Sequence, residues 1–364
     1  MNWRLVAIPA SVVPFIILFL TTNVSPQDVF AVGLVPFVVS AAAAITKIML
    51  QAYRFKYFIR RFIGYDVAST GETISARLAG EFVTQTTPSQ VGGEFVRIAW
   101  LSKKGVLPGK AAWVTTMEII ADVFVGSMLA FIAGALAIYR GGSVVGIAVI
   151  LVTIPTFAIW LALVLFSAKR NLRLPSFSQR IAEKFVSKEK ATSFINSTNS
   201  AIADLCKMSR ENFNSTKAIG TFAVGMAITF VAFVFQGVSF MVLANAVEPR
   251  VGLFDSLMAT SAATAFASLP ITIGGSGLAE LGLWAYIVNL SGIPDLGTIV
   301  SDSQLNVIIA WRIATYHVPL VIFWVALMKI TVRKVSPANV SSSQSAAGNN
   351  PADDKKGDSD NMTE

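Results

Sequence analysis

The sequence is poor in the residues from which most catalytic and metal sites are built. Its 364 residues include one cysteine, Cys206, and one histidine, His317. A single cysteine excludes a disulfide within the chain and a cysteine-rich metal site, and a single histidine argues against a multi-histidine metal site. Charged residues make up only 14% of the chain, against about 25% in ordinary soluble domains. This shortage of charge excludes an ordinary soluble domain.

Hydrophobic residues, by contrast, make up 54% of the chain, and its mean hydropathy is +0.63. We therefore predict an integral membrane protein with one polytopic domain over residues 1–335. Within it, residues 169–217 are polar and carry ten Lys/Arg, which we interpret as a cytoplasmic basic linker. Residues 336–364 are rich in Ser, Asn, Asp and Lys, so we expect a disordered cytoplasmic tail.

We expect an all-α fold with about six spanning helices. Their approximate ranges are residues 5–20, 29–53, 111–139, 144–167, 218–244 and 306–328. The first range could instead be a signal peptide, although no A-x-A cleavage pattern follows it. Residues 54–63 have apolar side chains at helical spacing among basic ones, which predicts a helix lying on an anionic membrane surface. Lys47, near the inner end of the second helix, is interpreted as a snorkelling lysine.

Two short motifs interrupt this pattern, and both read P-x-x-x-G-G. They are Pro88 with Gly92 and Gly93, and Pro270 with Gly274 and Gly275. Proline removes a backbone donor and paired glycines loosen a helix, so the backbone there needs hydrogen-bond partners that lipid cannot provide. We interpret residues 72–101 and 254–290 as two re-entrant helical hairpins that meet around a polar slot.

Positive charge is unevenly distributed along the chain. Of the 29 Lys/Arg, twenty-four fall within residues 54–110, 169–217 and 329–364. The positive-inside rule places these regions, and both termini, in the cytoplasm of a multi-pass protein of the cell membrane. In this orientation the unit helix–hairpin–helix occurs twice, and the second copy is inverted across the membrane relative to the first. Such an inverted repeat with broken helices is typical of alternating-access carriers.

Three motifs together carry a family resemblance. They are T-T-P-S-Q-V-G-G-E-F-V-R-I-A from residue 86, M-E-I-I-A-D from residue 117, and S-L-P-I-T-I-G-G-S-G-L-A-E from residue 268. In this order they resemble the flippase-like membrane family, also called the lysylphosphatidylglycerol synthase transmembrane region, over roughly residues 5–329. The resemblance implies movement of a phospholipid, glycolipid or polyprenyl-linked lipid between leaflets. Bacterial synthases of this family add a soluble aminoacyl-transfer domain, whereas only 35 residues follow Lys329 here, so we expect no synthase or other enzyme activity.

A lipid phosphate would need hydrogen-bond donors held inside the membrane. A short helix follows each glycine pair, and helix N-termini offer free amides and partial positive charge. We therefore expect anion sites at two groups of amides. They belong to Gly92, Gly93 and Glu94, and to Gly274, Gly275 and Ser276. The alternative is that the glycines serve only tight packing within each hairpin.

Charged residues complete the candidate substrate site. Arg97 and Arg312 could each bind a phosphate through two hydrogen bonds. Glu118 and Asp122 lie at i and i+4 on one helix face, and buried acids in a membrane are costly and often functional. They could balance a cation at rest or accept a proton or a cationic head group, or form a static ion pair near the cytoplasmic surface. Glu280 on the second hairpin has the same alternatives.

Two other functions remain open at this point. The chain could be an accessory subunit that docks a partner synthase through the basic linker. It could also be a membrane-embedded enzyme in which an acidic cluster holds a divalent ion. The acidic residues of that cluster would be Glu81, Glu94, Glu118 and Asp122. We expect no cofactor and no nucleic-acid partner, anionic lipid at the basic linker, and an oligomeric state that the sequence leaves open.

Overall fold

The computed structural model describes most of the membrane domain. The described residues are 32–87, 92–169, 177–178, 188–213, 215–247, 251–269, 272, 274–290 and 302–332. All regular elements within these ranges are helical. The expected first helix at residues 5–20, Pro88, Pro270 and the expected tail at 336–364 lie outside the described residues.

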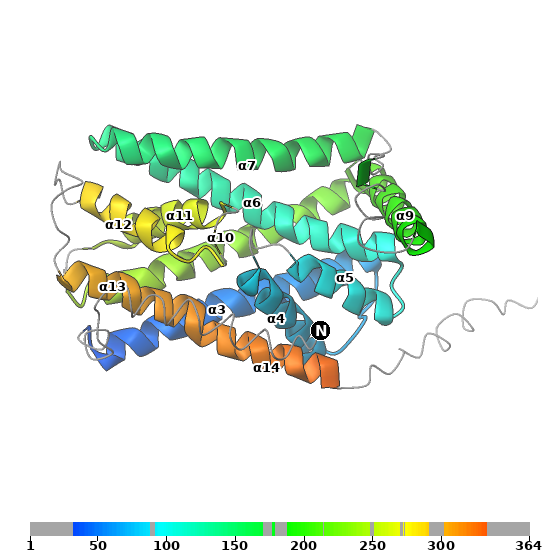
Figure 1. Ribbon diagram of the computed structural model, residues 1–364, viewed down its shortest axis with the longest axis horizontal. Helices are drawn as coiled ribbons and strands as arrows, with labels where there is room; N and C mark the ends of the chain where they lie inside the picture. The colour runs from blue at the N-terminus through cyan, green and yellow to red at the C-terminus, as the bar shows by residue number, and fades with distance from the viewer. Residues whose placement is uncertain are drawn as a thin grey trace, which may run out of the picture.

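Five helices in the described ranges are long and apolar enough to cross a membrane. They are Leu34–Ile63, Pro108–Tyr139, Ser143–Leu163, Thr216–Ala244 and Leu305–Thr331. Figure 1 shows them running roughly along the long axis of the molecule. Many of their outward side chains are large and apolar, such as Leu151 and Val321. The prediction of an all-α, multi-pass membrane protein is confirmed.

The first described span, α3 (Leu34–Phe58), continues directly into a π-helical turn, η1 (Ile59–Ile63). The turn ends at Gly64, whose φ of 99° lies in the left-handed region that suits glycine. The expected separate surface helix at residues 54–63 is therefore wrong. Phe55 and Phe58 are fully buried in a cluster with Trp113 and Val114 of the next span. The amphipathic spacing reflects a face that packs against protein, and not one that rests on lipid head groups.

Two helix–break–helix hairpins stand where the sequence predicted them. The first is α4 (Thr70–Thr86) and α5 (Gly93–Lys103), and the second is α11 (Leu253–Ala267) and α12 (Leu278–Leu290). Helix α4 begins with the N-cap residue Ser69, whose hydroxyl oxygen accepts a hydrogen bond from the Glu72 amide at 3.4 Å. Helices α4 and α5 lie toward the end of the bundle that carries α9, whereas α11 and α12 lie toward the opposite end (Figure 1).

Between the hairpins, α6 (Pro108–Tyr139) and α7 (Ser143–Lys169) run antiparallel. They approach closely at two glycines, because a Cβ on Gly134 would lie 3.0 Å from the carbonyl oxygen of Gly146. Helix α9 (Lys188–Phe213) occupies part of the expected basic linker and crosses one end of the bundle (Figure 1). The ends of α5 and α14 lie at that same end of the molecule.

The second half begins with α10 (Thr216–Ala244) and ends with one span made of α13 (Asp302–Arg312), a π-helical turn η2 (Ile313–His317), and α14 (Val318–Val332). The two halves exchange contacts reciprocally. Helix α3 packs along its counterpart α10, α4 packs on α14, and α11 packs on α6. Each hairpin thus contacts the last span of the other half, an arrangement that fits an inverted repeat.

Candidate functional site

The end of α4 and the second break meet in the interior of the bundle. The hydroxyl of Tyr316, in the π-helical turn of the last span, donates a hydrogen bond to the carbonyl oxygen of Gln85 at 2.8 Å. Gln85 lies in the last turn of α4, directly before the first break. Gly274, in the second break, also packs against Gln85 and Tyr316. Two segments about 190 residues apart in the chain are therefore in direct contact.

A cavity of about 140 Å³ lies at this meeting point. It is lined by residues of α3, α4, α10, α11, α12 and the last span, together with Gly274 of the second break. Its charged lining residues are Lys47, Glu81 and Arg312. Amides and hydroxyls supply most of the remaining polar lining. They are Gln51, Gln85, Gln236, Ser239, Thr264, Thr315 and Tyr316. A polar cavity thus lies between the two halves of an otherwise apolar bundle.

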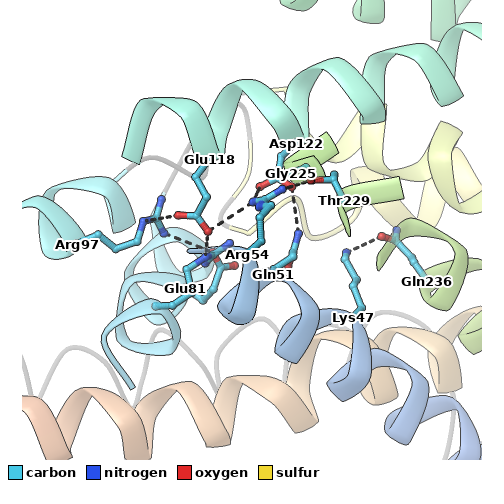
Figure 2. A network of polar contacts seen from close by, with 11 residues as sticks. Lys47, Gln51, Arg54, Glu81, Arg97, Glu118, Asp122, Gly225, Thr229 and Gln236 are labelled. Carbon is cyan, nitrogen blue, oxygen red and sulfur yellow. Dashed lines mark hydrogen bonds and ion pairs between the residues drawn. The ribbon is translucent and has the colours of Figure 1, made fainter. Parts of the chain in front are cut away.

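One wall of the cavity borders a buried cluster of charges centred on Glu118 of α6 (Figure 2). This carboxylate is 1% exposed. Its oxygens lie 2.6 Å from Arg77 Nε, 3.3 Å from Arg97 Nε and 3.5 Å from Arg54 Nη2. Three arginines from three helices therefore converge on one carboxylate. Because an unpaired charge in this environment would be very costly, the cluster fixes the first hairpin against α3 and α6.

Two more carboxylates complete the cluster. Asp122 accepts hydrogen bonds from both terminal nitrogens of Arg54, each at 2.7 Å, and from the Gln51 amide at 3.3 Å. Glu81 pairs with Arg77 one turn earlier on α4, and its carboxylate lies 3.8 Å from Arg97. Three guanidinium groups thus face three carboxylates, and their charges balance within the cluster.

The second hairpin has its own ion pair on the opposite wall. Arg312 Nε lies 2.9 Å from the Glu280 carboxylate. The same guanidinium donates to the carbonyl oxygen of Gly274 at 2.8 Å and to Ser276 Oγ at 3.4 Å. It also stacks over the ring of Tyr316, 4.1 Å from its centroid. Arg312 therefore holds the second break in place from the last span.

One of the candidate glycine amides, that of Gly92, has a partner within the protein itself. The amide of Gly92 donates to the carboxylate of Glu94 at 2.8 Å, and the amide of Gly277 donates to Glu280 at 2.8 Å. Carboxylates of the protein itself therefore occupy the N-terminal ends of both short helices. Glycine is needed there for packing as well, since a Cβ on Gly275 would lie 2.9 Å from the Ala267 backbone.

The structure joins most of the candidate residues into two groups. Arg97, Glu118 and Asp122 belong to the first cluster, and Gly274, Ser276, Glu280 and Arg312 belong to the second. Gly92, Gly93 and Glu94 form the start of α5, where Gly93 packs against Gly80 and Thr84 of α4. Gly275 lies buried in the second break. Pro88 and Pro270 lie outside the described residues.

Sequence reasoning missed several polar residues on α3. Lys47 does not snorkel to the surface, as was expected, but lines the cavity and donates to Gln236 at 2.5 Å. Arg54, assigned to a surface helix, is fully buried in the first cluster. The signal was their spacing, because Lys47, Gln51 and Arg54 fall at i, i+4 and i+7 and so share one face of an apolar helix.

Comparison with known proteins bears on this architecture. The family model described as "Lysylphosphatidylglycerol synthase TM region" matches residues 6–323. The chain belongs to this family. The match includes both hairpins and the residues of both charge groups. A relative described as a UPF0104 membrane protein, from Archaeoglobus fulgidus, is 24% identical over 275 residues, which cover 74% of this chain and 78% of the relative.

The acidic residues of this lysylphosphatidylglycerol synthase TM region do not converge on a common point. Glu81 and Glu118 face arginines, Asp122 faces Arg54, and Glu94 caps its own helix. Over the described ranges, no group of three or more His, Cys, Asp or Glu side chains is arranged to hold a metal ion. The alternative of a divalent ion in an acidic cluster therefore finds no geometric support in these ranges.

Proposed function

We propose that this chain translocates a lipid between membrane leaflets, by receiving the lipid head group in the cavity between its two hairpins. The observation that carries the proposal is that the end of α4 and the second break, one from each half, meet at a polar cavity in a bundle of apolar spans. Membership of the family supports a role at a membrane lipid. We propose further that the lipid leaves the protein chemically unchanged.

The energetic reason for such a cavity lies in the cost of moving a polar head group through hydrocarbon. A hydroxyl or amide that loses its hydrogen bonds on leaving water costs several kcal/mol, and an unpaired charge costs more. The amides and hydroxyls of the cavity, among them Gln51, Gln85 and Thr315, can replace part of the lost hydration. The acyl chains would meanwhile stay in lipid.

The inverted repeat suggests how access could alternate. We propose that both hairpins are re-entrant, the first from the cytoplasm and the second from outside, with both termini in the cytoplasm of a cell-membrane protein. Movement of one half against the other would then open the cavity first to one leaflet and then to the other. The Gln85–Tyr316 contact would separate and re-form in each cycle.

Reconstitution tests the proposal directly. The full chain would be incorporated into vesicles that contain trace amounts of fluorescent phosphatidylglycerol, phosphatidylethanolamine, a glycolipid or a polyprenyl-linked lipid. A membrane-impermeant quencher is then added outside. For at least one lipid, we expect label that starts in the inner leaflet to become accessible to the quencher faster than in protein-free vesicles. We also expect the recovered lipid to have an unchanged mass.

A pair of arginine variants serves as an internal control. Arg312→Met removes a cation from the cavity wall, whereas Arg140→Met removes one from an exposed pair with Asp255 at the end of α6. We expect the first variant to slow translocation strongly and the second to leave it near wild type. Translocation of none of the lipids by the wild-type protein would overturn the proposal.

A further inference from the structure

The end of α3 and the turn η1 have an outer face besides the inner face that packs against protein. The inner face carries Phe58, which is fully buried. On the outer face, Tyr53 and Tyr65 are 53% and 50% exposed, and Arg60 and Arg61 are exposed as well. None of these four residues lines the cavity between the hairpins. The outer face is therefore a surface separate from the proposed path of a translocated head group.

Aromatic and cationic side chains lie together on this outer face. Tyr53, Tyr57 and Arg61 fall at i, i+4 and i+8, and residues at this spacing share one side of a helix. The Arg61 guanidinium lies 5.5 Å from the centroid of the Tyr57 ring, which is a cation–π contact. The end of α3 thus presents a guanidinium that stacks on an aromatic ring, next to a second exposed arginine, Arg60.

The positive charge of the outer face is not matched within the protein. Neither Arg60 nor Arg61 forms an ion pair with any residue in the part of the chain that the structure describes. Within residues 53–66, Lys56 adds a third cation and Asp66 is the one carboxylate, while Arg54 belongs to the buried cluster. The surface therefore has a surplus of two positive charges, which favours an anionic ligand over a zwitterionic one.

The length of the span places this face at the depth of lipid head groups. The span Leu34–Ile63 has 30 residues, so at about 1.5 Å per residue it is about 45 Å long. The hydrocarbon core of a bilayer is about 30 Å thick, so about ten residues extend beyond it. Leu34 and Val35 are exposed and apolar at the start of the span, which keeps that end in hydrocarbon. The excess therefore lies at the other end, where tyrosine rings favour the membrane–water boundary and arginines reach the lipid phosphates.

We propose that this outer face binds one resident anionic phospholipid at the edge of the protein, outside the cavity. Arg60 and Arg61 bind its phosphate through charge-assisted hydrogen bonds, and the rings of Tyr53 and Tyr57 pack against its glycerol backbone and first acyl carbons. Each basic residue near an anionic lipid surface strengthens the attraction about fivefold, so the arginine pair should account for about 25-fold. The inference does not depend on the proposed function, because the site lies away from the cavity.

Photo-crosslinking of the full-length protein in vesicles tests this inference without any transport assay. The vesicles consist of phosphatidylcholine with a trace of phosphatidylglycerol that carries a diazirine near the start of one acyl chain. Phosphatidylcholine with the same diazirine is the comparison probe, and mass spectrometry of peptides locates the label. We expect the phosphatidylglycerol probe to label residues 53–65 at least tenfold more than the phosphatidylcholine probe. An excess of inorganic phosphate should not compete, because the ligand is a lipid.

Variants at the surface assign the charge. We expect the double variant Arg60→Gln and Arg61→Gln to lower labelling by the phosphatidylglycerol probe at least tenfold. Lys188→Gln with Lys207→Gln is the matched control, because both lysines are exposed on α9, which packs against the same apolar cluster as η1. It removes the same net charge and should be labelled like wild type. Tyr53→Ala should lower labelling by both probes, since its ring contacts parts that both lipids share.

Two results would overturn the inference. One is equal labelling of residues 53–65 by the two probes in the wild-type protein, which requires no variant to fold. The other is an equal loss of labelling in the arginine and lysine double variants, because the net charge of the surface, and not this site, would then attract the lipid. A loss confined to the arginine double variant supports the site whether or not the protein translocates any lipid.

Discussion

Gly274 and Gln85, one from each half of the chain, are in such close contact that a Cβ on Gly274 would lie 2.5 Å from the Gln85 carbonyl oxygen. Heavy atoms do not approach so closely without a hydrogen bond, so no other residue fits at position 274 without moving the first hairpin. The backbone φ of Gly274 is 60°, which other residues rarely adopt. This single residue therefore limits how near the two hairpins can be.

Gly274→Ala should accordingly separate the hairpins and impair lipid translocation. We expect the rate in vesicles to fall by an order of magnitude or more, because a displacement of about 1 Å at a preorganised site is enough to disrupt it. Gly141→Ala is the matched control. Gly141 has a φ of 94° but no atom within 4 Å of its hypothetical Cβ, so this variant shares the backbone strain without the collision. Equal rates for the two variants would contradict the prediction.

Tyr316→Phe should loosen the contact between the halves without unfolding the protein. It removes the 2.8 Å hydrogen bond to the Gln85 carbonyl and keeps the ring that packs on Arg312. A typical hydrogen bond contributes about 1 kcal/mol, so an open state would gain about fivefold in population. The measurement is thiol labelling of Thr315→Cys, a cavity residue, in a Cys206→Ser background. We expect faster labelling with Phe at position 316 than with Tyr, and an unchanged labelling rate would refute this.

Glu118→Ala should be the most destabilising single change in the first cluster. It leaves the guanidinium groups of Arg54, Arg77 and Arg97 with one carboxylate fewer at their centre. Removing one partner of a buried ion pair costs about 3–5 kcal/mol. Asp255→Ala removes the acid of an exposed pair with Arg140 and should cost less than about 1 kcal/mol. Thermal unfolding in detergent compares the two, and similar losses would show that the cluster is not a structural centre.

Gly146→Ala should weaken the packing of α7 on α6. The new Cβ would lie 2.9 Å from the Ile138 backbone nitrogen, and a helix backbone cannot yield locally. Overpacking of this kind costs about 1–3 kcal/mol. Gly220→Ala, on α10 with nothing within 4 Å of the added Cβ, should be neutral or slightly stabilising. Thermal unfolding of both variants checks the difference, and a loss of stability in Gly220→Ala would contradict it.

The sequence was sufficient to predict where α4 and α5, and α11 and α12, are separate helices, because proline and paired glycines interrupt helices through the backbone itself. The same local reasoning located the described spans to within a few residues, apart from the continuation of α3 through residues 54–63. Amphipathic spacing reveals that a helix has a distinct face, but it does not identify what that face contacts. The acidic partner of Arg54 is Asp122, 68 residues further along the chain, and no local pattern connects them.

The same limit applies to the cavity. Lys47 and Gln236 are 189 residues apart, and their contact depends on the packing of α3 along α10. The sequence identified Arg97 and Arg312 as free phosphate ligands because their carboxylate partners, Glu118 and Glu280, could not be assigned to them without the fold. The topological count of positive charges also included Arg54, Arg77 and Arg97, which are buried in the first cluster and are not exposed at the surface of the molecule.

The two halves carry their ion pairs with opposite polarity. In the first half the hairpin bears the cation, Arg97, and the spanning helix bears the anion, Glu118. In the second half the hairpin bears Glu280 and the spanning helix bears Arg312. In the alternating movement that we propose, perfectly equivalent halves would make the two end points equal in free energy. The reversed charges would remove that equality, so the empty protein would have one preferred resting orientation.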